Sequence, residues 1–83
     1  MPLFMDVHTI DGGVGFDDVA KAHMADLEKQ AAHGVKYLRY WVDESEGKVF
    51  CLVEAPTADA AHTVHREAHG LVAQEIYPVL EGS

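Results

Sequence analysis

The stretch VKYLRYWVDESEGKVFCLVEA, residues 35–55, decides the fold because it contains two strands joined by a tight turn. Residues 44–47 (Glu-Ser-Glu-Gly) are typical of a β-hairpin turn. The strand before the turn, 35–43, alternates, which divides its side chains between two faces. The expected sets are Leu38, Tyr40 and Val42 on one face and Tyr37, Arg39 and Trp41 on the other. The strand after the turn, 48–55, is apolar on both faces, which indicates a central position in a sheet.

Upstream of this hairpin, the sequence predicts a strand over 3–10 and a helix over 16–33. The strand alternates, with Leu3, Met5 and Val7 on one face and Phe4, Asp6 and His8 on the other. A turn signal, Asp-Gly-Gly-Val-Gly, separates the two elements, and Gly34 is expected to end the helix. The residues expected to face the core recur at three- and four-residue steps: Phe16, Ala20, His23, Leu27 and Ala31.

Downstream of the hairpin, Pro56 ends the strand and Thr57 caps a second helix that runs to about His69. A last strand over 71–80 contains Pro78, which cannot donate to a neighbouring strand, so we expect this strand at an edge. The order βαββαβ predicts an α+β, ferredoxin-like sandwich, with a four-stranded antiparallel sheet and two helices on one face. The whole chain, 1–83, is expected to form one domain with its first and third strands central.

The sheet face without helices is expected to be apolar and to need a partner. It would carry Phe4, Tyr37, Trp41 and either Phe50 or Leu52. Because a monomer rarely exposes so large an apolar patch, we expect a homodimer that packs sheet to sheet.

Composition excludes several functions. The chain has 83 residues and a formal charge of −8, so it lacks the positive surface that binds nucleic acid or an anionic membrane. Its one cysteine, Cys51, allows no internal disulfide and is expected to be buried and inert. No basic leader or long apolar run is present, so the expected compartment is the cytoplasm. The 6 histidines are the main candidates for function.

Three histidines of the second helix suggest a metal site. His62, His65 and His69 follow each other at steps of three and four residues, which places them along one stripe of the helix. Imidazole is a good ligand for nickel, copper, zinc and cobalt. The competing interpretation is structural: His69 helps to end the helix, as His33 does in the first helix, and His65 is a half-buried core residue.

Other candidate ligands lie outside that helix. Asp6 and His8 share the face of the first strand that we expect to be open, and Glu54 is expected to join them from the third strand. The alternative is a salt bridge at the dimer interface that involves Arg39. His23 is expected on the core side of the first helix, where it would face His65 or bond to a backbone carbonyl.

Several segments carry a resemblance to a known family: residues 5–8 (MDVH), 22–23 (AH), 49–56 (VFCLVEAP) and 64–65 (VH), followed by Gly70 and Ile76. Together they resemble a family of small bacterial ferredoxin-like proteins of unassigned function that includes dimeric nickel-sequestering proteins. The resemblance covers nearly the whole chain. It implies the fold, the dimer and a nickel site at the dimer surface, with His8, His23 and His65 in the shared pattern, whereas His62 and His69 rest on helix spacing alone.

The sequence therefore predicts, as the first interpretation, that the protein binds nickel or another divalent transition metal for sequestration or buffering. Its candidate ligands are His8, His23, His62, His65, His69, Asp6 and Glu54. The alternative is a small dimeric enzyme, similar to ferredoxin-like monooxygenases or isomerases. Its pocket between helices and sheet would be lined by His23, His65 and Cys51, with a histidine as general base.

Overall fold

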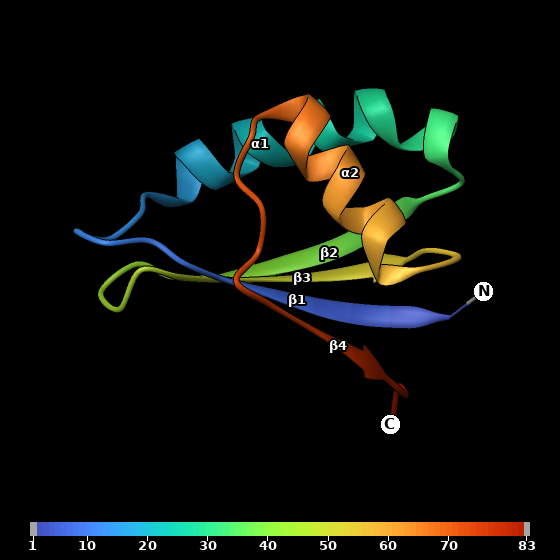
Figure 1. The fold of residues 1–83 in the computed structure, drawn as a ribbon. Coiled ribbons are helices and arrows are strands. Elements are labelled where there is room, and N and C mark those ends of the chain that lie inside the picture. Colours follow the sequence, from blue (N-terminus) through green and yellow to red (C-terminus); the bar gives the residue numbers. More distant parts are fainter. Residues whose placement is uncertain (1, 83) are drawn as a thin grey trace.

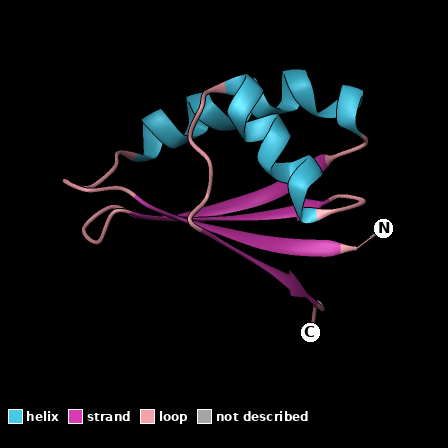
Figure 2. Ribbon diagram, viewed as in Figure 1, coloured by secondary structure: helices cyan, strands magenta, loops and turns pink. Residues whose placement is uncertain are grey.

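The computed structural model describes residues 2–82, which form one sheet with both α-helices on the same face (Figure 1). The elements in chain order are β1 (Leu3–Thr9), α1 (Phe16–Lys29), a short 3-10 helix η1 (Gln30–His33), β2 (Lys36–Asp43), β3 (Lys48–Glu54), α2 (Ala58–Ala68) and β4 (Glu75–Val79). Figure 2 shows the two layers, with helices above the sheet and the opposite face of the sheet uncovered. The ferredoxin-like arrangement is confirmed.

The strand order is β2-β3-β1-β4, and every neighbouring pair is antiparallel. The central positions of β1 and β3 and the edge position of β4, which contains Pro78, are therefore as predicted. Strand β4 begins only at Glu75, because residues 71–74 form an irregular connection. The C-terminal end of this connection is held by Gln74, whose side chain both accepts from the Thr9 N–H and donates to the Thr9 carbonyl.

The alternation of β1 was predicted correctly, but its direction was wrong. Asp6 and His8 are buried against the helices, and Phe4 packs on the core. The other set, Leu3, Met5 and Val7, therefore lies on the open face. Alternation identifies two faces of a strand without saying which one is inward. Here the polar face is inward because side chains of other elements provide hydrogen-bond partners for it.

Strand β2 departs from regular alternation at one point. The register with β3 shifts between Tyr37 and Arg39, so that one residue is inserted. As a result Tyr37, which we expected on the open face, is buried, and its hydroxyl oxygen lies 3.1 Å from the Ala61 carbonyl oxygen of α2. Arg39 and Trp41 do lie on the open face, where Trp41 is opposite Phe50.

Helix α1 is rotated relative to the prediction and is shorter. Its buried residues are Val19 and Asp26, whereas Phe16 and Leu27 are exposed. It ends at Lys29 and continues as η1, which ends at Gly34 with a φ of +66°. In α2 the predicted cap is confirmed, since Thr57 Oγ1 accepts from the Ala60 N–H at 3.2 Å. No helix within residues 2–82 is long and apolar enough to cross a lipid bilayer.

Candidate metal centre

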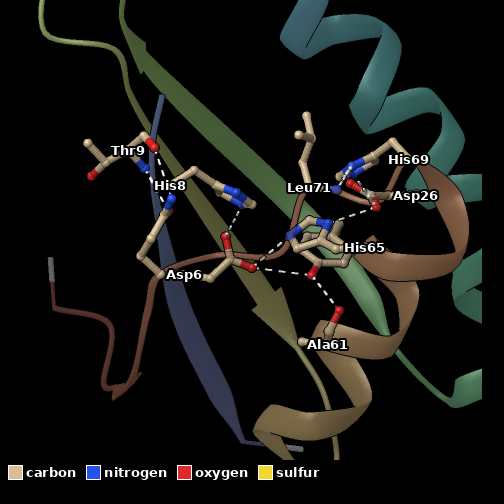
Figure 3. A network of polar contacts seen from close by, with 10 residues as sticks. Asp6, His8, Thr9, Asp26, Ala61, His65, His69 and Leu71 are labelled. Carbon is tan, nitrogen blue, oxygen red and sulfur yellow. Dashed lines mark hydrogen bonds and ion pairs between the residues drawn. The ribbon is translucent and has the colours of Figure 1, made fainter. Parts of the chain in front are cut away.

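A buried carboxylate, Asp6 of β1, lies between the sheet and α2 (Figure 3). Its Oδ2 atom is 2.9 Å from His65 Nε2 and accepts from the Tyr37 hydroxyl at 3.2 Å. Its Oδ1 atom is 3.1 Å from His8 Nε2. Strand β1 supplies Asp6 and His8 from one face, because they are two residues apart.

A second buried carboxylate, Asp26 of α1, lies on the other side of the His65 ring. Asp26 Oδ1 is 2.9 Å from His65 Nδ1 and 3.1 Å from His69 Nε2. His65 therefore bridges two carboxylates from different elements, and it does so inside the protein, since it is only 1% exposed. The rings of His65 and His69 are also adjacent, with centroids 5.0 Å apart.

This geometry determines the charge of the cluster. An ionised carboxylate only accepts hydrogen bonds, so both nitrogens of His65 carry a proton and donate. Burial by itself lowers the pKa of His65, but the hydrogen bonds to Asp26 and Asp6 outweigh it and raise that pKa to about 9. Burial likewise favours the neutral form of each carboxyl group, but the histidine hydrogen bonds hold the pKa values of Asp6 and Asp26 below the usual range. Two carboxylates and one imidazolium leave one net negative charge in the interior.

Two sets of potential metal ligands share this histidine. Asp6, His8, Cys51 and His65 form the inner set, and Asp26, His65 and His69 form the outer set. Within each set, one ligand atom of every residue lies within 4.8 Å of the others. The inner set faces Nε2 of His65 and the outer set faces Nδ1. Carboxylate and imidazole are suitable ligands for a divalent transition metal.

Comparison with known proteins agrees with this chemistry. Residues 4–79 match the model of the family described as "Nickel responsive protein SCO4226-like". The chain belongs to this family. It is similar to SCO4226 from Streptomyces coelicolor A3(2), whose crystal structure has 37% sequence identity to it and a TM-score of 0.89. The similarity covers 98% of this chain and 99% of the other. A search of the curated proteins finds no match.

In this member of the nickel responsive family, four of the candidate ligands come together: Asp6, His8, His65 and His69. Asp6 and His8 lie beneath the helices, so the prediction that they occupy the open face was wrong. The alternative of a salt bridge with Arg39 was wrong for the same reason, because Arg39 lies on the open face.

The other candidate ligands lie elsewhere. Glu54 pairs with Leu3 and Lys36 at the far end of the sheet and does not join Asp6. His62 belongs to neither ligand set, and its Nδ1 atom is buried without a hydrogen-bond partner within residues 2–82. His23 packs against the ring of Tyr40, with centroids 4.8 Å apart. His33 pairs with Glu67 of α2 at 2.9 Å, so it connects η1 to α2 in addition to ending a helix.

Sequence reasoning missed Asp26, the carboxylate that connects α1 to the cluster. An acidic residue is rarely buried unless it is paired, and Asp26 was therefore not among the candidate ligands. The sequence pattern that could have placed Asp26 on the inward face is its spacing. Val19, His23 and Asp26 follow each other at steps of four and three residues and therefore share one face of the helix. The partner that makes burial possible is His65, which is 39 residues away.

A cavity of about 60 Å³ lies beside the cluster, between α1 and the sheet. Its lining includes His23, His65 and Cys51, which are the residues that the enzyme interpretation placed in a pocket. Burial, reinforced by the charge of Asp6, raises the pKa of the Cys51 thiol far above neutral pH. The thiol is therefore protonated and is a poor nucleophile.

Proposed function

We propose that this protein binds nickel, or a similar divalent transition metal, through Asp26, His65 and His69, and that binding serves sequestration or buffering. The observation that carries the proposal is the convergence of one carboxylate and two imidazoles from α1 and the end of α2. The description of the family as nickel responsive supports the choice of metal. Nickel is here the bound cargo, and no reaction is required.

The outer set is favoured over the inner set because of access and charge. His69 is half-buried and borders the cavity beside α1, whereas all four residues of the inner set are buried. Ligation by Cys51 would require a thiolate, which burial beside Asp6 disfavours. Asp6 has a different role in the proposal: it accepts a hydrogen bond from His65 Nε2–H and so orients the ring that offers Nδ1 to the metal.

The charges of the protein favour capture of a cation. The chain carries a formal charge of −8, which raises the local concentration of cations around it. Inside the cluster, a divalent ion would replace the proton on His65 Nδ1 and keep two carboxylates nearby. The net negative charge of the cluster is thereby balanced instead of being left unpaired.

Calorimetric titration of the untagged protein with nickel tests this assignment. We expect His69→Ala to weaken nickel binding at least ten-fold, since it removes one of three protein ligands. His62→Ala is the matched control, because it removes the same residue type from the same helix outside both ligand sets, and it should bind as the wild type does. Loss of binding in His8→Ala with retention in His69→Ala would move the metal to the inner set. Equal binding in all three variants would remove it from both sets.

We further propose that a second copy of the chain covers the open face of the sheet. Trp41 and Tyr77 are 47% and 48% exposed there, and Phe50 and Met5 lie opposite them on the neighbouring strands. Large aromatic side chains gathered on one face are typical of a protein interface.

A small enzyme with its pocket between the helices and the sheet is a second candidate function, because one observation favours it. His23 borders the cavity, and burial lowers its pKa, which keeps its imidazole neutral as a general base requires. The cavity, at about 60 Å³, is small for an organic substrate. A small organic molecule retained through purification would favour the enzyme over the metal-binding protein.

A further inference from the structure

The two histidines of the outer set differ in what surrounds their ring nitrogens. Both nitrogens of His65 face carboxylate acceptors, Asp6 and Asp26. His69 Nε2 also faces Asp26, but its Nδ1 faces the backbone N–H of Leu71 at 3.1 Å (Figure 3). A backbone N–H can only donate, so Nδ1 of His69 must be an acceptor and the ring proton must lie on Nε2.

This difference matters when a metal arrives. A metal ion takes the lone pair of the nitrogen that it binds, and the proton of a neutral ring then lies on the other nitrogen. His65 can bind through Nδ1 without conflict, because its Nε2–H continues to donate to Asp6. If His69 binds through Nε2, however, its Nδ1–H points at the Leu71 N–H, and two donors face each other.

We propose that the backbone N–H of Leu71 is a latch that nickel releases. Capture of the ion by His69 Nε2 breaks the hydrogen bond between Leu71 and His69 and displaces Leu71 and Val72. The proposal rests on the function proposed above, since it requires the ion to bind at Asp26, His65 and His69. It adds a conformational response to metal binding in the connection between α2 and β4.

The contacts around this connection show which part can move. Its near end is held at Gly70, whose N–H donates to the His65 carbonyl at 2.9 Å. Its far end is held twice, by the two hydrogen bonds between Gln74 and Thr9, and Ala73 is buried. Between these ends, Leu71 is exposed and lines both the cavity beside α1 and a second hollow next to His8. Release of the Leu71 N–H would therefore change the lining of the cavity mouth while β4 stays paired with β1.

A proline substitution isolates the latch, because proline has no N–H. We expect Leu71→Pro to bind nickel about three- to ten-fold more tightly than the wild type, since no hydrogen bond is lost on binding. Leu71→Ala is the control: it keeps the N–H and removes the side chain, and its nickel affinity should equal that of the wild type. The affinities are measured by calorimetric titration with nickel chloride.

Amide hydrogen exchange of the wild type, followed by mass spectrometry with residue-level fragmentation, tests the latch without any substitution. Nickel should accelerate exchange at the Leu71 amide and leave the Thr9 amide, which donates to Gln74, protected. A protected Leu71 amide in the nickel-bound protein, or equal affinities in Leu71→Pro and Leu71→Ala, would overturn the latch. If His69→Ala still weakens nickel binding, the proposed function survives that result, whereas a wild type that binds no nickel overturns both.

Discussion

The sheet face beneath the helices carries Asp6, His8 and Tyr37, whereas the open face carries Trp41, Phe50 and Tyr77. The ionisable side chains of the sheet thus lie in the interior, whereas many of its large aromatic side chains lie on the uncovered face. The inner face tolerates charge because each charged group is paired: Asp6 is 0% exposed and has contacts with His8, Tyr37 and His65. The comparison shows that burial in this protein follows the supply of hydrogen-bond partners as well as hydropathy.

Removing a hydrogen-bond partner of His65 from the inner face should have the largest effect on stability. We expect Asp6→Ala to lower the free energy of unfolding of the metal-free protein by about 3–5 kcal/mol, because the His65 imidazolium would be buried with one of its two partners missing. Glu54→Ala, an acidic residue of the same sheet that lies outside the cluster, should change stability by less than about 0.5 kcal/mol. Urea unfolding near neutral pH measures both. Similar losses in the two variants would show that the buried cluster is not charged.

Deprotonation of His65 at high pH should change the free energy of unfolding by a somewhat smaller amount. The pKa of His65 is raised from 6.5 to about 9 on folding. Because the folded value is the higher one, the imidazolium stabilises the fold fully below about pH 6.5, and this contribution is lost as the pH rises through about 9. The loss amounts to about 3 kcal/mol.

Urea midpoints of the metal-free protein at pH 6.5, 8 and 9.5 measure this loss. His65→Gln is the control, because it cannot be protonated in this range, and its midpoint should change far less over the same interval. A wild-type midpoint that stays constant from pH 6.5 to 9.5 would contradict a cationic His65.

The smallest expected effect concerns the open face. We expect Trp41→Glu to weaken self-association by about 2 kcal/mol, because it places a charge in an apolar contact that a second copy would cover. Met24→Glu is the control, since Met24 is exposed on α1, on the other side of the molecule. Sedimentation at micromolar concentration compares the two. A wild type that sediments as a monomer would contradict the proposed dimer, and nickel binding by that monomer would separate the two faces functionally.

Part of the site could be predicted from the sequence, because it depends on local spacing. The steps between Asp6 and His8 on a strand, and between His65 and His69 along a helix, place each pair together in any protein with these elements. Asp26 and the Leu71 N–H could not be found in this way. Asp26 acquires its partners only when α1 packs against α2, and the Leu71 N–H meets His69 only through the conformation of the connection.

By itself, the sequence determined the order of the elements, the central and edge positions of the strands, the Thr57 cap and the family. The order of the elements, the strand positions and the cap depend on periodicity, turn residues and capping, which act over a few neighbouring residues. The family follows from the short sequence segments that it shares with this chain. Only the tertiary structure decided which face of β1 is inward, that Tyr37 turns beneath the helices at the irregularity of β2, and that His65 lies between two carboxylates. The physical reason is that a buried charge is stable only beside its partners, and here those partners come from segments 39 and 59 residues away along the chain.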